Sequence, residues 1–259
     1  MKKMPVIFVG HGSPMNAIEE NQFVEEWKKL KNVIPTPKAI LSVSAHWFTR
    51  GSRIMTSREP KLIYDMYGFP EELYKIVYAT KGAPQVANEV RSLLTREVTE
   101  DNSWGIDHGT WSVLRRIYPK ADIPVLQLSI DANATAREHY EMGQELRKLR
   151  EQGILVFGSG NVVHNLARVN WDMEQEGFDW AETFDRYIME AIQLKNHDAV
   201  IDYKQAGSSA NLSFTTMEHF APLLYVLGAS RMKDQITVFN QSCVLGSLSM
   251  TSYLFEEKE

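Results

Sequence analysis

The stretch that decides the fold is Val6-Ile7-Phe8-Val9-Gly10-His11-Gly12-Ser13-Pro14, near the start of the chain. A short apolar run that is rich in β-branched residues and ends in glycine and proline predicts a buried strand followed by a tight turn. In open α/β sheets, ligands bind beyond the carboxyl ends of the strands, so His11 lies where a functional group is expected. The glycines on either side of it allow a sharp turn and leave room for a ligand.

Similar apolar runs recur along the chain, and segments with helical periodicity separate them. Further strands are predicted at Ile40–Ser44, Ile123–Ile130 and Ile154–Phe157, and helices at Asn21–Leu30, Gln85–Leu94, Ala134–Arg150 and Trp180–Lys195. This alternation predicts an α/β fold in which helices flank a central sheet. Two late segments, Gln235–Gln241 and Ser247–Phe255, are expected to add antiparallel strands because no helix lies between them, so the sheet is mixed. With no internal repeat or long linker, residues 1–259 are expected to form a single domain.

Composition narrows the class of protein and its partners. The 259 residues are 44% hydrophobic and 24% charged, which is typical of soluble globular domains. The net charge of −5 and the dispersed basic residues argue against a nucleic-acid binder. No apolar run approaches the roughly 18 residues of a membrane span, and the first run is too short for a signal peptide. The single cysteine, Cys243, is expected to be buried in a reducing compartment. We therefore expect a cytoplasmic protein, monomeric or a small homo-oligomer, with small-molecule partners.

Two more histidines follow predicted strands. His46 lies in Ser44–Trp47, just after the second strand, and His164 lies in the glycine-rich segment Gly158–Asn165. That segment lacks the third glycine of a dinucleotide fingerprint and the lysine of a P-loop, so its histidine is the stronger signal. Histidines at the ends of neighbouring strands can converge on one metal ion, although a structural role in a turn stays open for each of them.

Two other segments contain candidate functional residues. His108 lies in Trp104–Trp111, a predicted loop dense in glycine and aromatic residues, where it could contact substrate or be held structurally by Asp107. Glu218 and His219 are adjacent, and only one is expected to be a metal ligand because neighbouring side chains point in different directions. The remaining histidines, His139 and His197, fall on polar helical stretches and are expected at the surface.

Together these segments resemble the class III extradiol dioxygenases, in particular the DOPA-dioxygenase branch with plant betalain-pathway and bacterial members. The resemblance spans nearly the whole chain. It is carried, in family order, by five segments: Gly10–Pro14, Ser44–Trp47, Asp107–Gly109, Gly158–Asn165 and Glu218–His219. Each segment alone is weak evidence, but the set is specific.

The resemblance implies roles for the histidines. His11 and His46 would be metal ligands, and the third ligand would come from the Glu218–His219 pair, where we assign His219 and keep Glu218 as the alternative. His164 matches the acid/base beside the metal and is also a candidate ligand, while His108 matches a histidine that contacts substrate.

The resemblance also implies the chemistry. The working metal would be non-haem iron(II), with zinc(II) able to occupy the same site. The substrates would be a DOPA-like catechol and O2, and the product a muconic semialdehyde. Trp47 and Trp111, together with Trp104, are candidates for the substrate pocket because indoles stack on aromatic rings.

Three other functions fit part of the pattern. A tetrapyrrole metal chelatase can also have a His-Gly-Ser turn after its first strand, but it needs only one or two such residues. A non-enzymatic metal-binding module on the same fold would keep the histidines without an open coordination position. A zinc hydrolase would activate a metal-bound water, and Glu218 is the one obvious carboxylate base for it.

Overall fold

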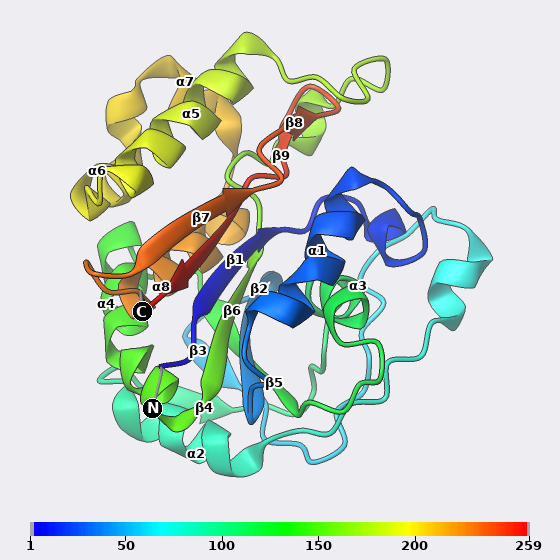
Figure 1. The fold of residues 1–259 in the computed structure, drawn as a ribbon, viewed down its shortest axis with the longest axis vertical. Helices are drawn as coiled ribbons and strands as arrows, with labels where there is room; N and C mark the ends of the chain where they lie inside the picture. Colours follow the sequence, from blue (N-terminus) through cyan, green and yellow to red (C-terminus); the bar gives the residue numbers. More distant parts are fainter. Residues whose placement is uncertain (1–2, 258–259) are drawn as a thin grey trace.

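The computed structural model describes residues 3–257, which form an α/β domain around an eight-stranded mixed sheet (Figure 1). The strand order is β4-β3-β5-β2-β6-β1-β10-β7. The strands are β1 (Val6–Gly10), β2 (Ala39–Thr49), β3 (Ser52–Ile54), β4 (Val98–Glu100), β5 (Val125–Asp131), β6 (Ile154–Gly160), β7 (Gln235–Phe239) and β10 (Ser252–Glu256). Two short strands, β8 (Cys243–Val244) and β9 (Leu248–Ser249), pair separately.

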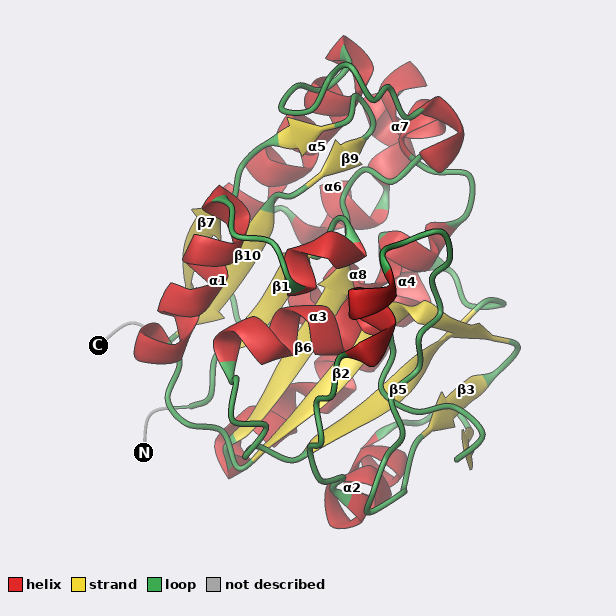
Figure 2. Ribbon diagram, turned by 90° about the vertical axis from the view of Figure 1, so that its right-hand side faces the viewer, coloured by secondary structure: helices red, strands yellow, loops and turns green. Residues whose placement is uncertain are grey.

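Helices cover both faces of the sheet. They are α1 (Gln22–Val33), α2 (Pro84–Leu93), α3 (His108–Ile117), α4 (Ala136–Leu146), α5 (Asp179–Gln193), α6 (His197–Ile201), α7 (Ser208–Ser213) and α8 (Ala221–Ala229). Figure 2 shows α1 and α3 over one face, with α4 and α8 over the other. Helices α5, α6 and α7 gather with β8 and β9 beyond one end of the sheet (Figure 1).

The mixed sheet confirms the predicted fold class. Strands β5, β2, β6 and β1 run parallel at its centre, as expected of buried apolar runs. Strand β10 pairs antiparallel with β1, and β7 pairs antiparallel with β10. This was predicted because no helix lies between the two late strand segments. Because β1, β2 and β6 are parallel neighbours, their carboxyl ends meet at one edge, where His11 follows β1.

The predicted helices are confirmed, with shifted ends. The third of them stops at Leu146 and continues as a 3-10 turn to Gln152, and the segment Ser247–Phe255 divides into β9 and β10. The sequence prediction missed α3 and α8, as well as the short strands β3 and β4. Helix α8 is buried along its whole length between the sheet and α4, so it has no polar face and shows no helical period.

The surface position predicted for His139 is wrong. This side chain is 1% exposed, and its Nδ1 lies 3.2 Å from the hydroxyl of Tyr225 on α8. Helix α4 packs closely on α8, so its buried face includes this polar residue. Burial lowers the pKa of His139 to about 4, which keeps it neutral. His197 is half-buried beside Tyr140, whereas Cys243 is buried as predicted.

A search of the described residues for a long apolar helix that could cross a membrane finds none.

Candidate metal centre

Three histidines from distant parts of the chain converge at the carboxyl edge of the sheet. Within residues 3–257, His11, His46 and His219 each offer a ring nitrogen within 4.8 Å of the other two. The Nε2 atoms of His11 and His46 are 3.2 Å apart. Two nitrogens bound to one ion with bonds near 2.0–2.1 Å would lie about 2.8–3.4 Å apart at angles between 90° and tetrahedral. The spacing therefore suits a shared ion.

His11 is held by its neighbours on β6. Its backbone N–H donates to the carbonyl of Gly160 at 3.1 Å, and its Nδ1 lies 3.0 Å from the hydroxyl of Ser159. Since that hydroxyl donates to the carbonyl of Gly109 at 2.6 Å, its oxygen accepts the hydrogen bond from the Nδ1–H of His11. The Nε2 of His11 then has a free lone pair, as a metal ligand requires.

His46 does not follow its strand, as the sequence suggested, but lies inside it. Strand β2 continues to Thr49, and its pairing with β5 shifts register between Val43 and Phe48. An irregularity of this kind re-aims a side chain that the regular alternation would point elsewhere. The Nδ1 of His46 lies 3.0 Å from the Oδ2 of Asp65, which leaves Nε2 directed at His11.

His219 comes from the 3-10 turn Met217–His219, just before α8. Its carbonyl accepts a hydrogen bond from the backbone N–H of Asn161 at 2.9 Å, and a Cβ on Gly160 would lie 2.1 Å from that carbonyl oxygen. Glycine is therefore required where the turn crosses the end of β6. The Nε2 of His219 is buried, with no hydrogen-bond partner among the described residues. A buried unpaired nitrogen is costly, and a bound metal ion would satisfy it.

Burial keeps two of the three imidazoles neutral. Desolvation, followed by repulsion from His46, holds the pKa of His11 well below its ordinary value. Desolvation, followed by repulsion from His164, does the same for the pKa of His219. Neutral imidazole is the form that binds a metal ion, so the donor set fits a divalent cation of the iron or zinc type.

Asp65 explains why His46 differs. Burial alone would lower the pKa of His46, but the hydrogen bond to Asp65 and the charge of Asp107 outweigh it, so this pKa is raised. Burial also opposes ionisation of Asp65 itself, yet hydrogen bonds from His108 and His46 hold its pKa well below the usual range. Asp65 therefore contacts two imidazoles, with each Nδ1 at 3.0 Å from a carboxylate oxygen.

His164 lies beside the three converging histidines. Its ring is parallel to that of His219, with an interplanar angle of 4° and centroids 3.4 Å apart. It does not belong to the set of ring nitrogens within 4.8 Å that His11, His46 and His219 form in the described chain. Burial, followed by repulsion from His46, lowers the pKa of His164 to about 3, so it is neutral.

His108 begins helix α3 rather than lying in a loop, and its partner is not Asp107. The Asp107 side chain caps α3 by accepting from the backbone N–H of Thr110 and also accepts from Ser44 and Gln127. Asp65 instead lies 3.0 Å from His108 Nδ1 and accepts its backbone N–H at 3.0 Å. Desolvation, followed by repulsion from His46, lowers the pKa of His108.

Sequence reasoning missed Asp65, which lies in an irregular connection with no periodic pattern to mark it. It also placed all three tryptophans in the substrate pocket without distinguishing between them. Trp47 is 3% exposed and stacks on Trp104 with ring centroids 6.3 Å apart. Trp111 is fully buried, and its indole N–H donates to the carbonyl of Ile63 at 3.0 Å.

Histidines that converge at the carboxyl ends of the parallel strands define an α/β protein with a candidate metal centre. Comparison with known proteins gives the class more closely. Residues 5–255 match the family model described as the catalytic LigB subunit of aromatic ring-opening dioxygenase. The chain belongs to this LigB family of extradiol aromatic ring-opening dioxygenases.

Individual relatives agree along the whole length. The chain is 44% identical over 256 residues to a protein of Escherichia coli K12 named "4,5-DOPA dioxygenase extradiol", with 96% of this chain and 94% of the relative covered. A protein of the same name from Beta vulgaris is 34% identical, with 96% and 95% covered. A crystal structure of an uncharacterized protein from Escherichia coli K12 matches with a TM-score of 0.85 and 40% identity, covering 97% of this chain and 99% of that one.

Proposed function

We propose that this chain opens the ring of a DOPA-like catechol by extradiol cleavage with O2, giving a muconic semialdehyde. The observation that carries the proposal is the convergence of His11, His46 and His219 within 4.8 Å, in a chain that belongs to a ring-opening family. The names of the relatives from Escherichia coli and Beta vulgaris support a DOPA-like substrate. A chelatase or a hydrolase would not account for this family membership.

In this proposal His11, His46 and His219 hold non-haem iron(II). When bound, the metal supplies the redox chemistry and orients the two catechol oxygens and O2. Because divalent zinc binds such sites more tightly than iron(II), we expect purified protein to contain zinc unless iron is supplied.

In this proposal, proton transfer and substrate contact are assigned to two histidines of the chain. His164 lies against the proposed ligand His219, with ring centroids 3.4 Å apart, so in this proposal its imidazole takes the proton of a catechol hydroxyl and returns it later in the reaction. His108 has its Nδ1 against the Asp65 carboxylate, so it presents its opposite ring edge to a substrate. The cleaved C–C bond lies next to the diol, and both oxygen atoms of O2 enter the product.

The tryptophans have different roles in this proposal. Trp47 is buried and stacked on Trp104, so the half-buried Trp104 is the indole of this pair that a catechol ring would contact. Trp111 is buried and bonded to the Ile63 carbonyl, so it would act on substrate through the segment that it supports rather than by direct stacking.

The test is anaerobic reconstitution with iron(II), followed by admission of air with a panel of catechols that includes DOPA. We expect one O2 consumed per catechol and a yellow ring-opened product. A protein that binds iron(II) stoichiometrically yet consumes no O2 with any catechol would contradict the proposal. Parallel assays of ester hydrolysis and of metal insertion into a porphyrin address the alternatives.

A further inference from the structure

His164 lies on a segment that leaves the end of β6 and runs beside the short strand β9. His164 and Leu248 form an antiparallel bridge. Next to this bridge, the backbone N–H of Ser249 donates to the carbonyl of Val163 at 2.9 Å. Strand β9 is therefore a backbone partner of residues 161–165, which we call the His164 segment.

Three more hydrogen bonds join β9 and the residue before it to the His164 segment. The N–H of Asn165 donates to the carbonyl of Ser247 at 3.1 Å, and the hydroxyl of Ser247 donates back to the carbonyl of Asn165 at 2.9 Å. At the other end of the segment, the side-chain amide of Asn161 donates to the carbonyl of Ser249 at 2.8 Å. The side chains of Asn161, Ser247 and Ser249 are buried, so water does not compete for these bonds.

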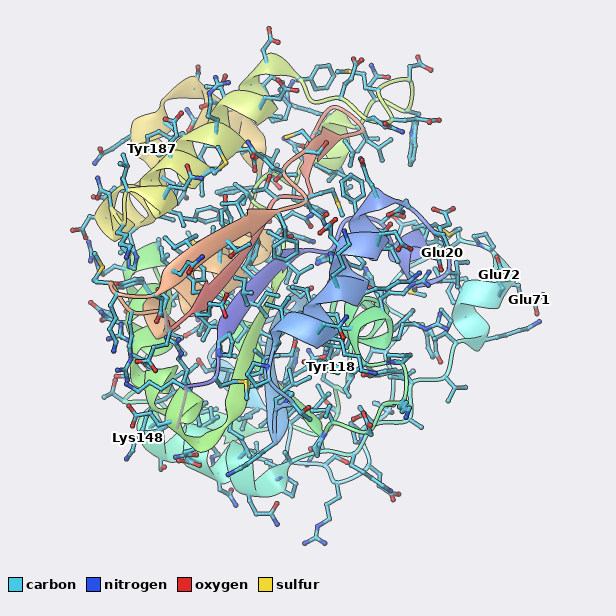
Figure 3. All side chains as sticks on the ribbon, viewed as in Figure 1. Glu20, Glu71, Glu72, Tyr118, Lys148 and Tyr187 are labelled. Atoms are coloured by element: carbon cyan, nitrogen blue, oxygen red, sulfur yellow. The ribbon has the colours of Figure 1, made fainter. Side chains whose placement is uncertain are left out.

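A carboxyl group on α5 anchors β9 from the opposite side. Oδ1 of Asp185 accepts a hydrogen bond from the hydroxyl of Ser249 at 2.5 Å, and Oδ2 accepts one from the hydroxyl of Thr251 at 2.7 Å. Residues two apart on a helix point in different directions. Tyr187, which is labelled on α5 in Figure 3, accordingly turns to α6 and donates to the carbonyl of Ala199 at 3.3 Å. The buried Asp185 is thus the residue of this turn that holds β9.

The three converging histidines are carried by other elements. His11 follows β1 and His46 lies inside β2, two central strands of the main sheet, whereas His219 belongs to the turn before α8. Only His164 lies on a segment that pairs with β9 along its length. A loosened β9 should therefore displace His164 more than it displaces the three proposed ligands.

We infer that Asp185 is a positioning residue that holds His164 at the metal centre through β9. Its carboxyl fixes the hydroxyls of Ser249 and Thr251, the backbone of β9 fixes the His164 segment, and that segment carries the imidazole. Buried hydrogen bonds of this kind keep a functional side chain within the narrow range of positions that catalysis requires. The inference rests on the proposed function for the acid/base role of His164, but the anchoring of the His164 segment does not.

Four variants test this inference. Asp185→Ala removes both hydrogen-bond acceptors. Asp185→Asn keeps one accepting oxygen, and its NH2 group can donate to the other hydroxyl, so it should restore the anchor. Ser249→Ala breaks the same contact from the β9 side and tests the inference even where Asp185→Ala does not fold. Glu190→Ala truncates an exposed carboxylate on the same helix and is the matched control.

The first measurement is amide hydrogen exchange of the folded zinc form, followed by NMR. In Asp185→Ala and Ser249→Ala we expect the amides of Ser249 and Asn165 to exchange at least about 10-fold faster, the effect of losing a buried hydrogen bond on local opening. Amides of β1 should stay within about twofold of the parent, as should all of these amides in Asp185→Asn and Glu190→Ala. Unchanged exchange at Ser249 and Asn165, or equal acceleration in β1, would overturn the inference.

The second measurement compares zinc affinity with kcat of the iron(II)-loaded protein. Asp185→Ala should bind zinc within about twofold of the parent, as expected of a site with no shared partner. Its kcat should fall by about 10- to 100-fold, the effect of displacing a catalytic group by about 1 Å, and Asp185→Asn should recover most of this loss. An unchanged kcat, or loss of zinc in step with kcat, would contradict the inference. Hydrogen exchange and zinc binding do not use turnover, so a parent protein without ring-opening activity would sink the proposed function and leave the anchoring result standing.

Discussion

On one side of the metal centre, His46 and His108 share the carboxylate of Asp65, whereas on the other side His164 and His219 stack face to face with centroids 3.4 Å apart. The Asp65 carboxylate beside the first pair contributes to the raised pKa of His46, whereas burial and repulsion from His46 lower the pKa of His108. The second pair is desolvated, and protonation of one ring would repel the other, so both stay neutral. The difference teaches that a nearby carboxylate favours a charged imidazole on one side of the site, whereas burial and mutual repulsion keep both imidazoles neutral on the other.

The largest effect is expected from removing the proposed ligand His219 on the stacked side. His219→Ala should weaken zinc or iron(II) binding by more than about 100-fold, beyond the range for losing an outer hydrogen-bonding partner, and turnover should fall with the metal. Metal content after dialysis, measured with the activity of the same preparation, checks this. Retention of stoichiometric metal by the variant would exclude His219 as the third ligand.

Removing the other stacked ring should separate metal binding from chemistry. His164→Ala is expected to keep most of the metal affinity but to lower kcat by about 10² to 10⁴, the usual span for losing a general acid/base. Metal analysis and steady-state kinetics distinguish the two roles. If metal is lost in step with activity, His164 is chiefly a ligand, and the two sides of the centre are less different than proposed.

Glu218 is the carboxylate on the stacked side, and it lies farther from its histidine than Asp65 does from His46 and His108. Its Oε1 lies 3.4 Å from Nδ1 of His219. Glu218→Gln should therefore reduce metal affinity by about 10-fold, at the low end of the range for an outer partner, and less than His219→Ala does. The reverse order would mean that the site uses two histidines and a carboxylate, with Glu218 as the third ligand.

An effect on stability rather than on the metal centre is expected from another buried carboxyl, Asp185 on α5. Asp185 accepts hydrogen bonds from Ser249 at 2.5 Å and Thr251 at 2.7 Å but has no cationic partner within residues 3–257, and burial raises its pKa to about 6. Asp65 is ionised because imidazoles donate to it, whereas Asp185 shows what burial does when only hydroxyls donate.

The raised pKa of Asp185 makes the stability of the protein depend on pH. Folded protein holds the Asp185 proton up to about pH 6, while the unfolded chain releases it near pH 4. The contribution of the protonated Asp185 carboxyl to the free energy of unfolding is therefore fully present below about pH 4 and is lost as pH rises through 6. Asp185→Asn should gain stability relative to the parent across this window, on the order of 2 kcal/mol. Urea unfolding of both proteins from pH 4 to 8 measures the difference, and a difference independent of pH would show that Asp185 titrates normally.

The sequence by itself determined the elements whose signal is local. The apolar run Val6–Val9 and the turn after it predicted β1 and the place of His11, because strand burial and turn formation depend on neighbouring residues. Five segments in family order indicated the class of enzyme. The adjacent pair Glu218 and His219 was recognised as one candidate position, and the choice of the histidine came from the resemblance.

Only the tertiary structure decided what depends on contacts between distant segments. The irregularity that aims His46 arises from pairing with β5, and the burial of His139 arises from the packing of α4 on α8. Asp65 lies 43 residues before His108 yet holds its ring, whereas the adjacent Asp107 caps a helix. The local periodicity of the sequence does not reveal such partners, because they are brought together only when distant segments pack in the folded structure.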